Sequence, residues 1–185
     1  MSAKAIILDP GHGLGNRAIG RYDTGAVAAG VEEATIAMDY VNEIRALLQA
    51  TVKVVRTRAN AKDPAPVFER ASVARRYNGV VMLSVHCNEG GGRASGVEVF
   101  YRGNEHKNKA AEISATVAKI FGIPDRGAKT ESESQHSRLA IMSFQPCFLL
   151  ELGFIDNATD RKAILDPAKR LEVAEKLSEI LLTFI

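Results

Sequence analysis

The stretch Ala5-Ile6-Ile7-Leu8-Asp9-Pro10-Gly11-His12-Gly13 decides the fold. Its four apolar residues indicate a buried strand, and the proline, glycines and histidine mark where that strand ends. Two more apolar runs have the same form: residues 80–85 lead into His86, and residues 147–150 lead into Glu151. In an α/β sheet, ligands bind just beyond the carboxyl ends of the parallel strands. The three runs therefore predict such a sheet with a functional site at one edge.

The rest of the chain alternates between strand-like and helix-like segments. The predicted strands are residues 4–9, 52–56, 79–86, 96–101, 138–143 and 147–152, and the predicted helices are residues 33–49, 66–77, 105–121, 157–165 and 168–184. This alternation predicts an α/β fold with helices on both faces of a largely parallel sheet. Glycine-rich residues 13–31 and polar residues 122–137 are predicted loops. Since no repeat, low-complexity tract or linker divides the sequence, we expect residues 1–185 to form a single domain without a separate cell-wall-binding module.

The composition excludes several classes of protein. A net charge of +2 without a basic stripe argues against nucleic-acid binding. Cys87 and Cys147 are too few for a disulfide framework, and Cys147 falls in an apolar run that predicts a core position. No run reaches the roughly 20 apolar residues of a membrane span, and the first four residues lack the features of a signal peptide. We therefore expect synthesis in the cytoplasm and no integral membrane segment.

His12 and His86 are the first candidates for metal ligands. Each follows a predicted buried strand, so both should reach the same edge of the sheet. Asp9 is a candidate partner for the imidazole of His12, because a carboxylate or carbonyl usually holds a metal-bound histidine. The alternatives are a loop histidine without a role for His12 and a hydrogen-bonded core histidine for His86. Strand alternation points Cys87 to the other face, which makes it a poor ligand.

A third ligand can come from Glu32 or Glu33, where the helix predicted over residues 33–49 begins. With about 100° per residue and Ile36 at zero, the apolar stripe of this helix centres at roughly 65°. Glu33 falls at about 60° and Glu32 at about −40°, so Glu33 points inward and Glu32 away. An inward carboxylate needs a cation, whereas a first-turn glutamate favoured by the helix dipole explains only Glu32 well. Two histidines and a carboxylate at one edge are the parts of a zinc hydrolase site.

Glu151 lies within an apolar run, where a carboxylate is either paired or has a raised pKa. Both conditions suit a general base beside a metal-bound water. The alternative is a buried salt bridge, for example with Arg126 or Arg138. Glu98 is predicted to lie on the polar face of an edge-like strand. The remaining histidines, His106 and His136, are predicted to be solvated, and Glu131 and Glu133 belong to the polar loop.

Short motifs run in order along nearly the whole chain. They are Leu-Asp-Pro-Gly-His-Gly at 8–13, Asp-Thr-Gly-Ala at 23–26, Glu33, Val-Val-Arg-Thr-Arg at 54–58, Ser-Val-His-Cys-Asn at 84–88, Gly-Val-Glu-Val-Phe-Tyr at 96–101, Arg-Leu-Ala-Ile-Met at 138–142 and Leu-Glu-Leu-Gly-Phe-Ile-Asp-Asn at 150–157. As a set, they make the chain resemble the zinc-dependent N-acetylmuramoyl-L-alanine amidases of the amidase-3 type. These are the catalytic domains of many bacterial wall-remodelling enzymes and phage endolysins. The sequence departs from the common pattern at Cys87, which replaces a small residue, and at residues 141–145, which lack an arginine that many members carry.

The resemblance implies a fold and a set of roles. The fold is a three-layer α/β/α domain around a twisted, mostly parallel central sheet. His12, Glu33 and His86 would bind one Zn²⁺ ion, and Glu151 would be the catalytic glutamate. Asn88 would be a supporting residue. By their charge and expected position alone, three basic residues are candidates to meet the acidic stem peptide of the substrate, with solvation at the surface as the alternative, namely Arg93, Arg126 and Lys129.

The activity implied is hydrolysis of the amide between N-acetylmuramic acid and L-alanine in peptidoglycan. Zinc would lower the pKa of a bound water and stabilise the oxyanion, and Glu151 would carry the proton from the water to the departing nitrogen. The alternatives are a zinc peptidase that cuts within the stem peptide and a non-catalytic wall-binding module. We expect a monomeric phage or prophage endolysin that reaches the cell wall or periplasm through a holin. We also expect an open site, because residues 103–138 contain one predicted helix and no additional helix to cover the metal.

Overall fold

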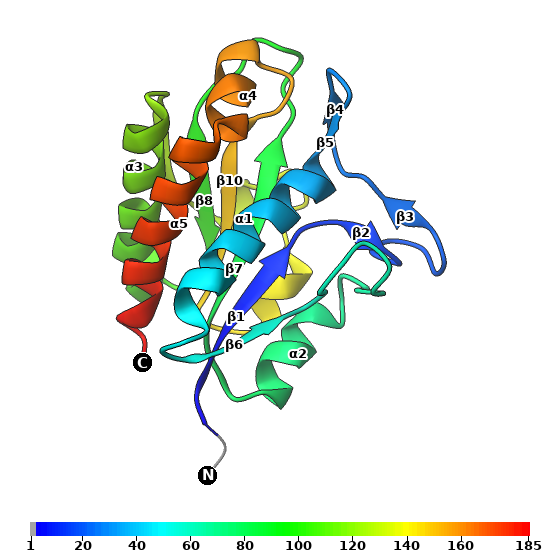
Figure 1. Cartoon of the computed structure of the whole chain (residues 1–185), viewed down its shortest axis with the longest axis vertical. Coiled ribbons are helices and arrows are strands. Elements are labelled where there is room, and N and C mark those ends of the chain that lie inside the picture. Colours follow the sequence, from blue (N-terminus) through cyan, green and yellow to red (C-terminus); the bar gives the residue numbers. More distant parts are fainter. Residues whose placement is uncertain (1–2) are drawn as a thin grey trace.

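The computed structural model describes residues 3–185, and at its centre lies a six-stranded sheet (Figure 1). In spatial order, its strands are β6 (Lys53–Arg56), β1 (Ala5–Pro10), β7 (Gly79–Asn88), β10 (Cys147–Phe154), β8 (Val97–Tyr101) and β9 (Asp125–Thr130). All neighbouring strands run parallel except β10 and β8. The sheet is therefore mostly parallel, as the sequence predicted.

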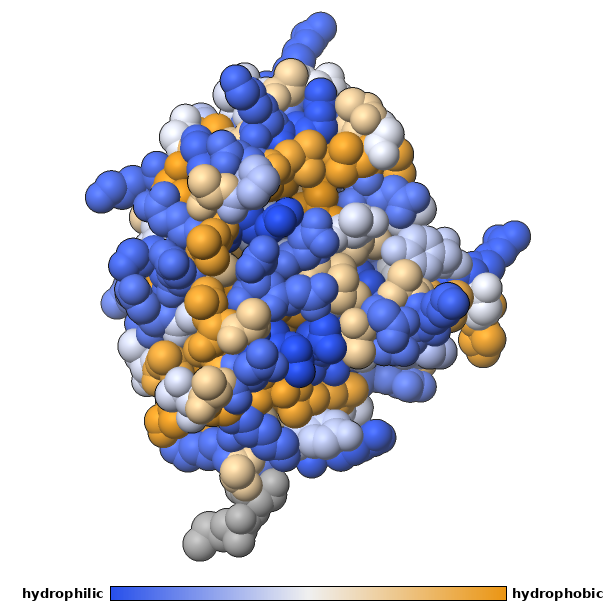
Figure 2. Space-filling view, viewed as in Figure 1, coloured by the Kyte–Doolittle hydropathy of each residue, from blue (hydrophilic) through white to orange (hydrophobic). Residues whose placement is uncertain are grey.

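Helices cover both faces of this sheet. They are α1 (Glu33–Leu48), α2 (Arg70–Arg76), α3 (Lys107–Phe121), α4 (Ala158–Leu165) and α5 (Pro167–Leu182), with short 3₁₀ turns η1 (Asn104–His106), η2 (Glu131–Glu133) and η3 (Ala140–Ser143). Figure 1 shows α1, α3 and α5 side by side over one face. α2 and η3 pack together on the other face. The result is the expected three-layer α/β/α domain, whose outer surface mixes polar and apolar side chains on the face seen in Figure 2.

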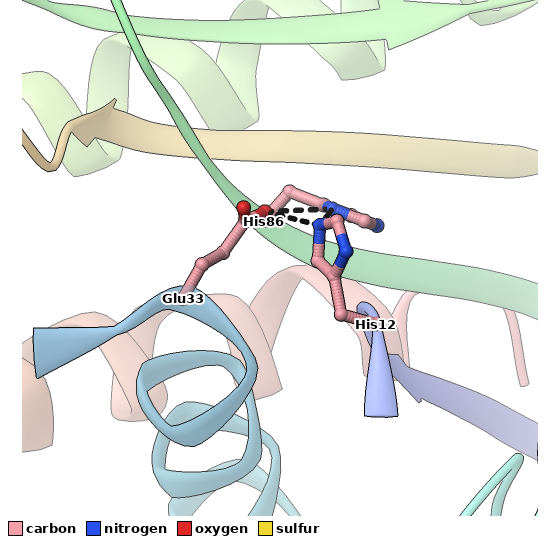
Figure 3. Close-up of side chains that lie close together, drawn as sticks. All are labelled: His12, Glu33 and His86. Atoms are coloured by element: carbon pink, nitrogen blue, oxygen red, sulfur yellow. Dashed lines mark hydrogen bonds and ion pairs between the residues drawn. The ribbon is translucent and has the colours of Figure 1, made fainter. Parts of the chain in front are cut away.

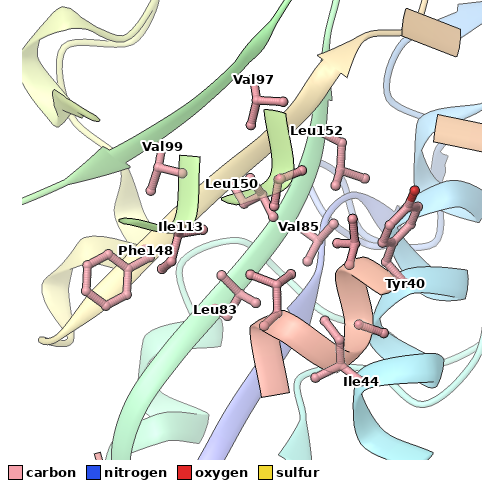
Figure 4. Close-up of a cluster of buried hydrophobic side chains, with 14 of the residues drawn as sticks. Tyr40, Ile44, Leu83, Val85, Val97, Val99, Ile113, Phe148, Leu150 and Leu152 are labelled. Carbon is pink, nitrogen blue, oxygen red and sulfur yellow. The ribbon is translucent and has the colours of Figure 1, made fainter. Parts of the chain in front are cut away.

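The larger apolar core lies between the sheet and α1, α3 and α5 (Figure 4). Alternate residues of the strands point into it, such as Leu83 and Val85 of β7, and they meet Tyr40 and Ile44 of α1 and Ile113 of α3. Cys87 also belongs to this core, as strand alternation predicted. The other set of alternating residues forms a smaller core on the α2 side.

The α2-side face changes from apolar to polar towards the carboxyl ends of the parallel strands. On β1 Ile7 is followed by Asp9, on β7 Met82 is followed by Ser84 and His86, and on β10 Leu149 is followed by Glu151. Because alternate residues share a face, these polar side chains lie on one side of the sheet. The fold thus delivers ionisable groups to the edge where the first strand-end motif predicted a site.

Two of the predicted elements were wrong. Residues 138–143 do not form a strand, because consecutive Ile141 and Met142 are both buried in the 3₁₀ turn η3 and period-two alternation fails. The predicted loop 122–137 contains strand β9, whose polar residues pair with β8 alone at the sheet edge. An edge strand needs no apolar face on both sides, so its composition resembled that of a loop.

The long glycine-rich loop folds into two short antiparallel ribbons. They pair β2 (Gly13–Leu14) with β3 (Tyr22–Asp23) and β4 (Val27–Ala28) with β5 (Val31–Glu32). The helix predicted over residues 66–77 begins later, at Arg70. Within residues 3–185, no helix combines the length and the apolar character that crossing a membrane requires.

Candidate metal centre

Three predicted ligands come from three separate segments of the chain and meet at the carboxyl edge of the sheet (Figure 3). His12 follows β1 in a left-handed conformation, with a φ of 58°. Glu33 is the first residue of α1, and His86 stands near the end of β7. Figure 3 shows the three side chains pointing towards one another.

The ligand atoms form a compact triangle. Oε1 of Glu33 lies 2.9 Å from Nε2 of His12 and 2.9 Å from Nδ1 of His86. The two imidazole nitrogens are 3.2 Å apart. Zinc bonds of about 2.0–2.1 Å in a tetrahedron would place ligand atoms about 3.3 Å apart. A zinc ion therefore fits these donors with only a small expansion of the triangle, and the donor set of two imidazoles and one carboxylate suits it chemically.

The carboxylate of Glu33 is held ionised although only 3% of the residue is exposed. Burial alone raises its pKa, but the hydrogen bonds and charges of His12 and His86 outweigh burial and hold the pKa well below its usual range. The backbone N–H groups of Cys87 and Ala26 also donate to it, at 3.0 and 2.9 Å. The inward direction predicted for Glu33 from helical phase is confirmed, and this buried anion faces two imidazoles.

The pKa of the His12 imidazole also depends on burial and on the neighbouring charges. Burial lowers its pKa, whereas the neighbouring carboxylates of Glu33 and Asp23 raise it, and the net shift is upward. A divalent cation bound here would compensate the charge of Glu33 and would take deprotonated imidazoles as ligands, because metal ligands must be deprotonated.

Glu151 lies beside the triangle on the neighbouring strand. It pairs in register with His86 across the parallel ladder of β7 and β10, so both side chains share one face. Its Oε2 atom is buried and has no hydrogen-bond partner among residues 3–185. Burial raises the pKa of Glu151 well above its ordinary value, and the nearby charges of Glu33 and Glu98 raise it further. An unpaired carboxyl group with high proton affinity can accept and return a proton.

Among residues 3–185, no salt bridge to Glu151 is seen, so the alternative of a buried ion pair is not supported. Arg126 instead donates to Glu98 at 2.5 Å, together with Lys129 at 2.5 Å and Asn88 at 2.9 Å. Glu98 was predicted on the polar face of an edge-like strand. That prediction was wrong, because β9 continues the sheet beyond β8 and leaves Glu98 only 4% exposed. Asn88 therefore supports Glu98, next to Glu151 in the ladder.

Asp9 does not orient His12, contrary to the prediction. Its carboxylate is fully buried and accepts hydrogen bonds from Thr57, from Ser84 at 2.5 Å and from Arg70 at 2.7 Å. It points from β1 towards α2, on the face that also carries His86. The carboxylate near the His12 ring is Asp23, whose Oδ2 lies 3.1 Å from Nδ1.

Two buried arginines of the site were missed at the level of sequence. Arg58 donates to the carbonyl groups of Pro10, Gly11 and Ala34, and both Arg58 and Arg70 are only 2% exposed. Arginine is usually exposed, so no periodicity marked them. Arg58 does belong to the motif Val-Val-Arg-Thr-Arg at 54–58, and this motif was the sequence feature that could have identified it.

Comparison with known proteins identifies the family of the chain. Residues 6–182 match the model of the family Amidase_3, described as N-acetylmuramoyl-L-alanine amidase. The chain is 29% identical over 179 residues to "Probable cell wall amidase LytH" of Staphylococcus aureus, covering 92% of this chain and 54% of that protein. It is 26% identical over 198 residues to an uncharacterized cell wall amidase of Bacillus anthracis, covering 96% of this chain and 34% of that protein. The chain thus spans about a third to a half of the length of these curated relatives.

Solved structures share the fold. The catalytic domain of the amidase CwlV from Paenibacillus polymyxa superposes with a TM-score of 0.83 at 23% identity, covering 98% of this chain and 97% of that one. An N-acetylmuramoyl-L-alanine amidase from Clostridium difficile gives a TM-score of 0.83 at 22% identity, covering 100% and 97%. Because the family model matches nearly the whole sequence, the chain belongs to the Amidase_3 family of N-acetylmuramoyl-L-alanine amidases.

Proposed function

We propose that this chain is a zinc-dependent hydrolase of the amide between N-acetylmuramic acid and L-alanine in peptidoglycan. The observation that carries the proposal is the meeting of His12, Glu33 and His86 at one sheet edge, with Glu151 in register beside His86. The family match supports the bond and the polymer, and the ligand triangle supports one zinc ion. In this proposal the three residues bind the metal and Glu151 is the catalytic residue.

The reaction needs a stronger nucleophile than water and a protonated leaving nitrogen. A bound zinc ion supplies a Lewis acid that polarises the amide carbonyl and makes water more acidic. Glu151 removes the proton of the attacking water and passes it to the alanine nitrogen when the C–N bond breaks. Its unpaired Oε2 suits this role, because no other described residue competes for the proton.

The structure also supports an open site. Between Gly103 and Arg138, α3 is the single α-helix of the described chain, and it packs against β8, β9 and α5. Its buried residues belong to the larger core, on the face opposite Glu151 and His86. The side chains of His12 and His86 keep 12% and 19% of their surface exposed. We therefore propose that solvent can reach the bound metal.

The first test compares peptidoglycan hydrolysis by metal-stripped, zinc-loaded and variant protein. Dye release from labelled peptidoglycan should require zinc and should disappear in His86→Ala. The matched control is His106→Ala, because His106 lies at the start of α3 and contacts Phe148 and Glu105 rather than the triangle. Equal activity in stripped and loaded protein would contradict the zinc dependence. Full activity in His86→Ala would contradict the ligand assignment.

The biological setting stays a prediction. It comprises a single catalytic domain that acts as a monomer, phage origin and holin-dependent release to the cell wall. The proposed chemistry does not depend on any of these.

A further inference from the structure

The side of His12 that faces away from the ligand triangle carries an unexplained contact. Nε2 points to Glu33, whereas Nδ1 is buried and forms no hydrogen bond of good angle within residues 3–185. Its ion-pair contact is Oδ2 of Asp23, 3.1 Å away. A polar ring nitrogen is thus buried against a carboxylate, which is the partner that a metal-bound histidine commonly requires.

Each oxygen of the Asp23 carboxylate accepts one hydrogen bond that holds it in place. Oδ1 accepts the backbone N–H of Gly25 at 2.9 Å, and Oδ2 accepts the side-chain amide of Asn16 at 2.6 Å. Arg17 lies 3.5 Å from Oδ2, but its side chain is largely exposed. The hydrogen bonds from Gly25 and Asn16, both partly buried, fix where the Asp23 carboxylate stands relative to the ring of His12.

The side chain of Arg70 also holds the backbone of His12. This guanidinium uses all five N–H groups: it donates to the carbonyl groups of Ala65 at 3.0 Å, Pro10 at 2.9 Å and His12 at 2.6 Å, to Asp9 at 2.7 Å and to Oδ1 of Asn16 at 3.1 Å. Asn16 therefore links Arg70 to Asp23. One buried cation holds the His12 carbonyl directly and the His12 ring through two side chains.

We propose that Asp23 is a positioning residue, which accepts a hydrogen bond from Nδ1 of His12 and so directs Nε2 towards the metal. Arg70 and Asn16 hold Asp23 in place for this purpose. The inference rests on the proposed function, because it assumes that His12 binds zinc. It adds a residue that touches neither zinc nor substrate, and whose loss is expected to weaken metal binding before it weakens the fold.

A simpler role for Asp23 is to shape its turn through the bond to Gly25. Asp125 provides a matched control for that role, because its Oδ1 also accepts the N–H of the glycine two residues later, Gly127, at 2.9 Å. Both glycines have a left-handed φ, 66° and 79°. Asp125 contacts no residue of the triangle and bonds Ser114 instead.

The experiment measures the zinc affinity of metal-stripped protein by competition with a chromophoric chelator, alongside the melting temperature of each metal-free variant. Asp23→Asn should weaken zinc binding by about 10- to 100-fold. Asp125→Asn should leave it within about twofold of wild type, since metal ligation does not involve it. Wild-type affinity in Asp23→Asn would overturn the positioning role alone. Failure of the wild-type protein to bind zinc would overturn the metal centre itself, and the positioning role with it.

A second measurement needs no variant and so does not depend on whether one folds. Long-range proton–nitrogen NMR of the zinc-loaded wild-type protein should show the His12 ring with its proton on Nδ1 and zinc on Nε2. Zinc on Nδ1 of His12, or a ring proton that exchanges as freely as one in solvent, would overturn the proposal.

Discussion

At the scale of single residues, the site depends on the placement of a few polar atoms in a largely apolar domain. Glu151 and His86 were recognisable because each ends an apolar run, and burial and alternation are local properties of sequence. Asp23 was not recognised as a partner of His12, because the short strand β3 is brought to the segment after β1 only by folding of the glycine-rich loop between them. Asp9 stood nearer in sequence, but its side chain points to Arg70.

The proton-transfer role of Glu151 predicts a selective loss of activity. Glu151→Gln keeps the size and polarity of a protonated carboxyl group but cannot exchange its proton, so hydrolysis should fall by about 10²- to 10⁴-fold. Zinc content and melting temperature should stay close to wild type. Turnover on peptidoglycan, with zinc measured by elemental analysis, checks this. Activity within a few-fold of wild type would show that another group carries the proton.

Gly11 sets the space available to the His86 ring. A Cβ at this position would lie 2.4 Å from Cε1 and 2.6 Å from Nδ1 of His86. Gly11→Ala should therefore displace the ligand and weaken zinc binding by about tenfold or more, which chelator competition can measure. Gly20→Ala is the control for zinc binding: its added methyl meets no atom of residues 3–185 within 4 Å, so the strain at its left-handed φ of 71° should lower stability without displacing a ligand. If Gly11→Ala bound zinc as tightly as wild type, the packing described for His86 would be wrong.

At the scale of elements, the first turn of α2 anchors the loop after β1. Arg70→Met would leave the charge of Asp9 buried and unpaired, at an expected cost of about 3–5 kcal/mol in the free energy of unfolding. The comparison is Arg102→Met, which removes a partly exposed pair with Glu131 and should cost about 1 kcal/mol or less. Urea unfolding of both variants tests the difference. Similar losses in the two would refute the anchoring role.

The interactions of Glu98 on β8 with β9 make the stability of the fold depend on pH. Burial raises its pKa, but the bonds from Arg126, Lys129 and Asn88 outweigh burial and lower it. A lowered folded-state pKa stabilises the fold above the unfolded value of about 4.3, and this contribution is lost as the pH falls through the folded pKa. Wild type should therefore lose more unfolding free energy than Glu98→Gln between about pH 6 and about pH 3. Parallel pH profiles for the two proteins would contradict this.

The elements that escaped sequence-level prediction share a physical reason. β9 has a polar sequence and owes its conformation to backbone pairing with β8, and η3 has an apolar pair that suits a strand as well as a turn. Pairing of segments far apart in the chain is not encoded in local periodicity. The central strands and the long helices were predictable because burial imposes a period on each of them.

At the scale of the whole molecule, two unequal cores explain where the site lies. Three helices, α1, α3 and α5, pack on the larger core of one face of the sheet, whereas α2 and η3 pack on the smaller core of the other. The carboxyl end of the second face, beyond the smaller core, carries the ionisable residues, and α1 supplies Glu33 to the same site. Neither core contains a metal ligand, so we expect the domain to fold without zinc.

The account is tested most directly by mass spectrometry of the soluble products after the zinc-loaded protein digests purified peptidoglycan. It predicts stem peptides that begin with an unblocked L-alanine, together with glycan strands that keep their sugar linkages intact. Fragments cut inside the stem peptide would place the same zinc site in a peptidase. No products from protein with confirmed zinc would contradict the proposed activity and favour a binding module.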